Sequence, residues 1–264
     1  MKPLSPKHPI LIFLIVLFVS CQENGKQQRV VLMQDIQDWI LPEYSLKSRH
    51  IRNEIEQLTQ DEPKMYADAF TKKYYAGRGH FVWITRHGVG DNADTLLSYL
   101  NKVDEEGLKP SSFFVSNIEN DLHKLRNKEE NEEDVNRLMG RLEFQLTKAY
   151  LRYAAGQRYG YTLPSHILNN IESEKSYPEA SQRHHFGIHS EMATDSFYLR
   201  AIQEVQAGNL GTFLGAIQPQ IPLFNTLKQD FLTAKKAANE ERARLARINM
   251  ERARWRYPRP QGKY

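Results

Sequence analysis

The stretch from Glu133 to Ala155, EDVNRLMGRLEFQLTKAYLRYAA, carries the strongest structural pattern in the chain. Its apolar residues recur at helical spacing along the whole stretch, so that they fall on one face. They are Val135, Leu138, Leu142, Leu146, Ala149 and Tyr153. The pattern predicts one long helix with a buried face, and Gly156 is the residue at which we expect this helix to end.

Shorter helical patterns flank this stretch on both sides. Asp61-Glu-Pro63 predicts a helix start, and Tyr66, Phe70 and Tyr74 would then share one helix face. Further helices are expected after Asp91-Asn92, after Pro110, over Thr194–Gln206, over Asn209–Ile217 and over Leu223–Trp255. Extended structure is indicated only over His80–Ile84. The sequence therefore predicts an all-α fold, an irregular bundle of about six to eight helices with a long C-terminal helix and at most a minor short strand pair.

The composition is that of a folded protein with nearly balanced charge. Of the 264 residues 40% are hydrophobic and 11% aromatic, which is enough for a core, and the formal net charge is only +4. This charge does not indicate a nucleic-acid partner. The basic residues gather toward the end, where residues 235–264 hold ten Lys or Arg and three Glu. Such a run is typical of a solvated helix face, and the alternative is an anion-binding surface with Arg252, Arg254, Trp255 and Arg256 as candidate binding residues.

The first 21 residues have the pattern of an exported lipoprotein. Lys2 and Lys7 precede the uncharged stretch Ile10–Ser20, and Cys21, the only cysteine, follows it. Eleven helical residues span about 16 Å, which is too short for about 30 Å of hydrocarbon. We therefore expect cleavage after residue 20, a lipid on Cys21 and a cell-envelope location at the periplasmic face. A short signal anchor is the alternative, and Gln22 after the cysteine favours the outer membrane.

Two groups of residues could carry chemistry, but a simpler interpretation is favoured for each. His184, His185 and His189 lie near two acids and could hold a metal, although the surrounding polar residues indicate an exposed loop. The aromatic residues of 74–83 could stack on a sugar ring, but a packed core is the favoured interpretation. The sequence shows no nucleophile motif, and we expect neither a metal nor a cofactor.

Five motifs in order resemble those of one known family. They are Phe70-x-x-x-Tyr74-Tyr75-x-x-Arg78-Gly-x-Phe81-x-Trp83, Glu106-Gly107-Leu108-x-Pro110-x-x-Phe113, Thr147-x-Ala149-Tyr150-x-Arg152-Tyr153, Ile217-x-Pro219-x-x-Pro222-x-Phe224-x-x-Leu227 and Ile248-Asn-Met-Glu-Arg-x-Arg-Trp255-Arg256. Together they cover roughly residues 60 to 260 and resemble the scaffold region of large murein L,D-transpeptidases.

The resemblance implies a role in the bacterial cell wall. Enzymes of this family join meso-diaminopimelate residues of peptidoglycan stem peptides by 3→3 cross-links, with a cysteine nucleophile and a histidine base on a mostly β catalytic domain. In this chain no His is followed by the family's Ser/Thr-x-Gly-Cys segment. The catalytic domain would begin just after Tyr264, so the chain is not expected to be an enzyme by itself and resembles a truncated product or one part of a split protein.

These expectations combine into one description of the chain. Residues 1–20 are a lipoprotein signal peptide, 21–45 a tether, 46–232 a helical L,D-transpeptidase scaffold domain and 233–264 a charged leader helix and tail. The expected partners are peptidoglycan or a catalytic L,D-transpeptidase domain, and the membrane through the lipid. One alternative is a free-standing adaptor lipoprotein that binds peptidoglycan or a wall enzyme. The other is an enzyme of a different type, centred on the histidine loop.

Overall fold

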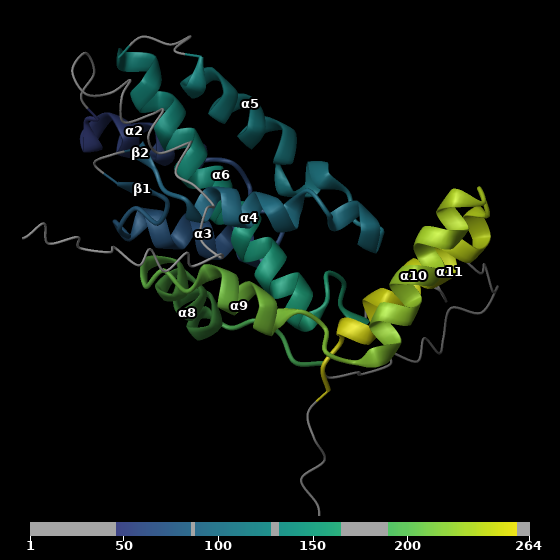
Figure 1. Ribbon diagram of the computed structural model, residues 1–264. Coiled ribbons are helices and arrows are strands. Elements are labelled where there is room, and N and C mark those ends of the chain that lie inside the picture. Colours follow the sequence, from purple (N-terminus) through teal and green to yellow (C-terminus); the bar gives the residue numbers. More distant parts are fainter. Residues whose placement is uncertain (1–45, 86–87, 128–131, 165–189, 258–264) are drawn as a thin grey trace, which may run out of the picture.

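The computed structural model describes residues 46–85, 88–127, 132–164 and 190–257, and this part of the chain is mostly helical (Figure 1). Its nine α-helices are α2 (Ser48–Leu58), α3 (Tyr66–Ala76), α4 (Asn92–Leu100), α5 (Val115–Arg126), α6 (Glu132–Tyr159), α8 (Asp195–Gln206), α9 (Leu210–Ile217), α10 (Pro222–Lys236) and α11 (Glu240–Arg254). Two short 3-10 helices, η1 (Val103–Glu106) and η2 (Pro110–Phe113), and two strands, β1 (Ile84–Thr85) and β2 (Gly88–Val89), complete it. The predicted all-α class with a minor strand pair is confirmed.

The long helix α6 is the centre of the body, which we define as α2 to α9. It contacts α2, α3, α4, α5, α8, α9 and α11, and all six predicted apolar residues on it are buried. The predicted end at Gly156 is wrong, because the helix continues to Tyr159. Gly156 matters for packing instead, since a Cβ there would lie 2.0 Å from Cε1 of Tyr161.

A buried carboxylate holds the strand pair against α6. The strands pair antiparallel with Ile84 opposite Val89. Glu143 of α6 accepts hydrogen bonds from the backbone N–H groups of Trp83 and Ile84, both at 3.0 Å, from that of Val82, and from the Tyr75 hydroxyl at 2.6 Å. Burial raises the pKa of Glu143, and these four donors oppose that rise.

The aromatic cluster predicted near the strands is largely core. The rings of Tyr75 and Trp83 are buried, and Tyr74 and Phe81 pack against them partly exposed. Trp83 also donates from Nε1 to Thr147 Oγ1 at 2.9 Å. The favoured interpretation, a packed core, is confirmed for the two buried rings.

Helix α3 begins later than the sequence indicated and turns a different face inward. It starts at Tyr66, and Asp68 accepts hydrogen bonds from the N–H groups of Lys64 and Met65 just before it. The predicted common face is wrong: Phe70 is buried, whereas Tyr66 is 61% exposed. The helix α2 was not indicated at all, although Ile51 and Ile55 bury one side of it.

The last two helices form an antiparallel hairpin that projects from the body (Figure 1). The predicted continuous helix from Leu223 to Trp255 is wrong, because the chain turns at Ala237–Asn239 between α10 and α11. The hairpin has a small core of its own, made of Phe224, Phe231, Ala234, Ala243, Ala246 and Met250.

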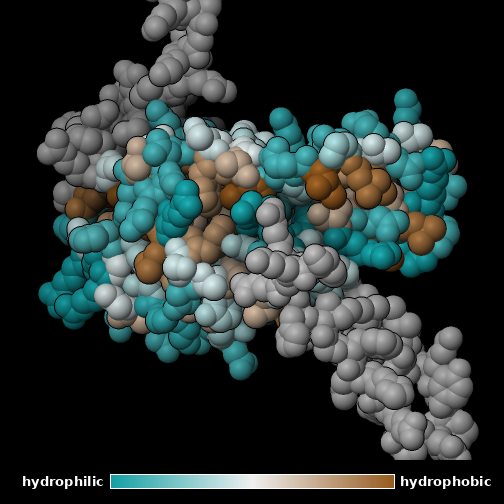
Figure 2. Space-filling view, turned by 90° about the horizontal axis from the view of Figure 1, so that it is seen from below, coloured by the Kyte–Doolittle hydropathy of each residue, from teal (hydrophilic) through white to brown (hydrophobic). Residues whose placement is uncertain are grey.

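Figure 2 shows the hairpin as a separate lobe beside the body, with a largely hydrophilic surface and small separate hydrophobic areas. The large exposed apolar side chains of the described residues are Met65, Tyr66, Met192, Leu199, Ile221, Leu223, Leu245 and Tyr257. Within the described ranges no helix is both long enough and apolar enough to cross a bilayer.

Candidate functional site

The hairpin meets the body at a junction built around three buried polar side chains. Arg254, the last residue of α11, forms an ion pair with Glu106 of η1. Gln157 of α6 donates from Nε2 to Glu106 Oε2 at 2.8 Å and accepts from Arg254 Nε at 3.2 Å. Because all three side chains are buried, each depends on the others for its hydrogen bonds. This network joins the leader helix to both η1 and α6.

Helix α11 also holds the chain that follows α6. The carboxylate of Glu251 accepts hydrogen bonds from the backbone N–H groups of Tyr161 and Thr162, both at 2.6 Å. Burial raises the pKa of Glu251, and the nearby charge of Arg254 acts in the opposite direction.

Helix α10 contributes a second ion pair to the junction. Lys228 Nζ lies 2.8 Å from Glu105 Oε2 and 3.8 Å from Glu106 Oε1. Glu106 therefore faces cations from both helices of the hairpin, Lys228 of α10 and Arg254 of α11.

The residues just after α11 continue the attachment. Trp255 donates from its indole Nε1 to the Thr162 carbonyl at 2.9 Å, and Arg256 donates from Nε to the Arg158 carbonyl at 2.8 Å. Gly160 permits this approach, since it has a φ of +96° and a Cβ there would lie 2.6 Å from Trp255 Cδ1. These contacts fasten Trp255 and Arg256 to the end of α6 and to the residues that follow it.

The four candidate binding residues have different surroundings. Arg254 is only 3% exposed, and Trp255 and Arg256 are half-buried against the body. Arg252 is exposed, and its Nη1 donates a hydrogen bond to Asn249 Oδ1 at 3.4 Å. Their role in binding stays a prediction, but three of the four have a visible structural role at the junction.

Sequence reasoning missed the acceptors of the junction. Glu106 stood in one of the motifs, but nothing local to it indicated Arg254 as its partner, because the two are 148 positions apart. Glu251 also stood in one of the motifs, but nothing there indicated its contact with residues 161 and 162, and Gln157 stood in no motif.

A second buried ion pair stabilises the body. Arg152 of α6 donates from Nε and Nη2 to the two carboxylate oxygens of Asp68, at 2.6 and 2.7 Å. Burial alone would raise the pKa of Asp68, but the hydrogen bond and charge of Arg152, with Lys148 nearby, lower it below its usual value. Both Asp68 and Arg152 are buried, so this pair ties the start of α3 to α6.

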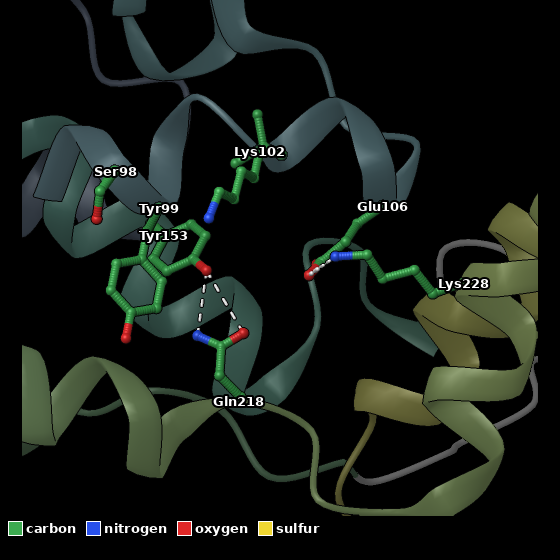
Figure 3. A pocket seen from close by; sticks show the side chains of 8 residues that line it. Ser98, Tyr99, Lys102, Glu106, Tyr153, Gln218 and Lys228 are labelled. Carbon is green, nitrogen blue, oxygen red and sulfur yellow. Dashed lines mark hydrogen bonds and ion pairs between the residues drawn. The ribbon is translucent and has the colours of Figure 1, made fainter. Parts of the chain in front are cut away.

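Three pockets surround the junction. The first, of about 390 Å³, lies between α4, η1, α6 and α10 and is drawn in Figure 3. The second, of about 550 Å³, and the third, of about 260 Å³, lie where α11 passes η1. All three therefore lie where the body and the hairpin meet.

The other residues singled out from the sequence lie outside the described part. These residues are Cys21 and the three histidines His184, His185 and His189, and their predicted roles stay predictions. Among the described residues, no group of three or more His, Cys, Asp or Glu side chains is arranged to hold a metal ion.

The fold and the junction define a helical module whose projecting hairpin is attached to the body through the buried Arg254–Glu106 pair. The profile of the Scaffold domain family matches residues 69–230, which is more than half of the chain. The chain therefore belongs to the Scaffold domain family, the scaffold of L,D-transpeptidases. Neither a curated protein nor a solved structure matches the chain significantly.

Proposed function

We propose that this chain is the non-catalytic scaffold of an L,D-transpeptidase-like lipoprotein of the cell wall. Its role is to hold a catalytic domain, supplied by another segment or polypeptide, in a fixed position near peptidoglycan. The reaction it serves is the 3→3 cross-linking of stem peptides. The sequence given contains one cysteine, Cys21, which the proposal assigns to a lipid.

The attachment of the leader helix α11 is the observation that supports this role. In this proposal, a catalytic domain that follows α11 is positioned through the orientation of that helix. Burial of Arg254 against Glu106 and Gln157, followed by the contacts of Trp255, fixes this orientation at the body. Support of this kind is what a catalytic site needs, because rates fall steeply when reacting groups are misplaced by about 1 Å.

Binding in trans tests the proposal. The full chain, purified in detergent, is titrated into an L,D-transpeptidase catalytic domain that lacks its own scaffold. The formation of cross-linked dimers from tetrapeptide muropeptides is measured by mass spectrometry. We expect saturable binding and faster cross-linking, with no product from this chain alone. Absence of binding and of any rate change contradicts the proposal, and retention on isolated sacculi without either effect favours the adaptor alternative.

The proposed lipid on Cys21 has its own test. Cells that express the chain are labelled with a clickable palmitate, and the mature protein is examined by mass spectrometry. We expect a lipidated N-terminal cysteine and recovery with the outer membrane, and loss of both in Cys21→Ser. An uncut leader with a free thiol contradicts the lipoprotein assignment.

A further inference from the structure

The leader helix α11 packs on α10 with one face and on the body with another. The residues that it buries against α10 are Ala243, Ala246 and Met250. Toward the body, the Arg247 side chain passes over Gly107, and Glu251 holds the backbone of residues 161 and 162. Leu245 takes part in neither contact and is 46% exposed. Helix α11 therefore has a third face, and a leucine on it is open to solvent.

Four residues of this third face have the spacing of a helix–helix seam. Glu241, Leu245, Ile248 and Arg252 follow one another at intervals of four, three and four positions, which keeps them on one side of the helix. Glu241 and Arg252 are exposed, and Ile248 is half-buried. We call these four residues the outer stripe. Single exposed leucines are common on protein surfaces, so the order of the four residues carries the argument.

The outer stripe is complementary to itself when two copies meet antiparallel. In two antiparallel helices related by a two-fold axis, the numbers of facing residues have a constant sum. When Leu245 faces Ile248 of a second copy, Glu241 therefore faces Arg252 of that copy. The apolar side chains then meet at the centre, with opposite charges at both ends. A parallel pair would instead place Glu241 against Glu241 and Arg252 against Arg252, and such like-charge contacts are unfavourable.

Both charged ends of the outer stripe can form these contacts. Within the described ranges Arg252 forms no ion pair, and its only hydrogen bond there is the one that Nη1 donates to Asn249 Oδ1 at 3.4 Å. Glu241 pairs with Arg244 of its own helix, which donates to both carboxylate oxygens, at 2.9 and 2.7 Å. Because each carboxylate oxygen has a second lone pair, Glu241 can also accept from Arg252 of a second copy.

We propose that the outer stripe of α11 binds a second copy of this chain, so that two leader helices pack antiparallel about a two-fold axis. Each copy contributes the same surface, which closes the assembly at two chains. Two short helices bury less than the roughly 1,600 Å² of a standard interface, so we expect a reversible dimer with a Kd of about 10–100 µM. The inference rests on the outer stripe and does not depend on a catalytic partner.

Sedimentation equilibrium of the full chain in density-matched detergent tests the proposed dimer. We expect a reversible monomer–dimer equilibrium. Leu245→Ser should weaken it by about tenfold or more, because both copies lose a leucine from the contact. Leu199→Ser is the matched control, since Leu199 of α8 is 47% exposed but belongs to the body, and this variant should associate like the wild type.

An exchange of charges tests the antiparallel orientation. Glu241→Arg and Arg252→Glu should each weaken association by about tenfold or more, because each change brings like charges together. The double variant places opposite charges together again and should associate like the wild type. Since both residues are exposed, these changes should leave the fold intact.

Three results would overturn the inference. The first is a chain that stays monomeric up to ~200 µM. The second is equal association of the Leu245→Ser and Leu199→Ser variants. The third is a double charge variant that associates no more tightly than the two single variants.

Discussion

Arg254 and Arg244 both form ion pairs from α11, but only the pair made by Arg254 is buried. Arg254 is 3% exposed against Glu106, whereas Arg244 pairs with Glu241 at 2.7 Å at the surface of the hairpin. Exposed pairs add little to stability, while removing one partner of a buried pair leaves an uncompensated charge. The two arginines therefore make a matched comparison on one helix.

Arg254→Gln should loosen the hairpin from the body. Loss of the Arg254 guanidinium leaves the buried carboxylate of Glu106 without its nearest positive charge. We therefore expect the free energy that holds the hairpin to the body to fall by about 3–5 kcal/mol. Faster amide hydrogen exchange in α11 would reveal it. Arg244→Gln should leave exchange in α11 close to that of the wild type. Equal exchange in the two variants would show that the buried pair does not secure the junction.

Asp68→Asn should make stability less dependent on acid pH. The pKa of Asp68 is lowered in the folded state, so the pair contributes fully above the unfolded value of about 3.9 and is lost as the pH falls through the folded value. We expect the variant to be less stable than the wild type at neutral pH, with the difference shrinking below pH ~4. Urea unfolding across this pH range measures it. A difference that stays constant or grows as the pH falls would refute the role of the pair.

Local sequence patterns could identify few of the residues that matter at this scale. Arg254 and Glu106 both stood in recognisable motifs, yet their contact joins positions far apart in the chain. Glu143 lies inside an apolar helix pattern. Nothing in the sequence indicates that it accepts hydrogen bonds from the backbone N–H groups of residues 82–84, at and just before β1. Buried polar contacts of this range follow from the tertiary fold and not from local spacing.

At the scale of elements, two helices end with the same motif but with different residues. After α8, Asn209 N–H donates to Glu204 and Gly208 N–H to Val205, with Gly208 at φ +75°. After α10, Asn239 N–H donates to Ala234 and Ala238 N–H to Lys235, with Ala238 at φ +52°. Both are Schellman ends, in which glycine is the favoured residue.

The alanine at position 238 explains why the sequence pattern did not predict the hairpin. The sequence indicated the end of α8 because Gly208 marks it, and no glycine or proline marks the turn at Ala238. The apolar and charged pattern continues through that turn, so it predicts one helix. By contrast, α6 was predictable because its buried face repeats at helical spacing over its length.

Ala238→Gly should stabilise the hairpin turn. The left-handed backbone costs an L-residue roughly 1–2 kcal/mol, and glycine avoids this cost. Glycine also loses more conformational entropy on folding than alanine does, which offsets part of the gain, so we expect a net stabilisation of about 0.5–1 kcal/mol. Gly208→Ala is the reciprocal change, and it should destabilise the protein by about 1 kcal/mol because alanine would have to adopt the left-handed conformation. A steric clash should not add to this cost, since a Cβ at residue 208 would meet nothing within 4 Å. Thermal unfolding measures both. A loss of stability in Ala238→Gly would contradict the assigned turn.

At the scale of the whole molecule, the body and the hairpin have separate cores of different size. The core of the body extends from Ile51 to Ile217, whereas that of the hairpin contains six buried residues. Regions with few buried apolar contacts open at lower free energy than the rest of a protein. The junction network therefore restrains a hairpin that has only a small core of its own.

Native-state hydrogen exchange should separate the two parts. Amides of α6 are expected to exchange only through global unfolding, because this helix lies at the centre of the body. Amides of α10 and α11 should exchange faster, through a partial opening that leaves the body folded. A single common opening free energy for α6 and α11 would show that the hairpin is an integral part of the body.

The central claim is that the attached leader helix positions a catalytic domain, and a chimera tests it most directly. An L,D-transpeptidase catalytic domain is joined after Tyr264, and 3→3 dimers formed from tetrapeptide muropeptides are counted by mass spectrometry. The account predicts faster cross-linking by the chimera than by the free catalytic domain, a fall toward the free rate with Arg254→Gln, and little change with Arg244→Gln. Equal rates for the chimera and the free domain would contradict it.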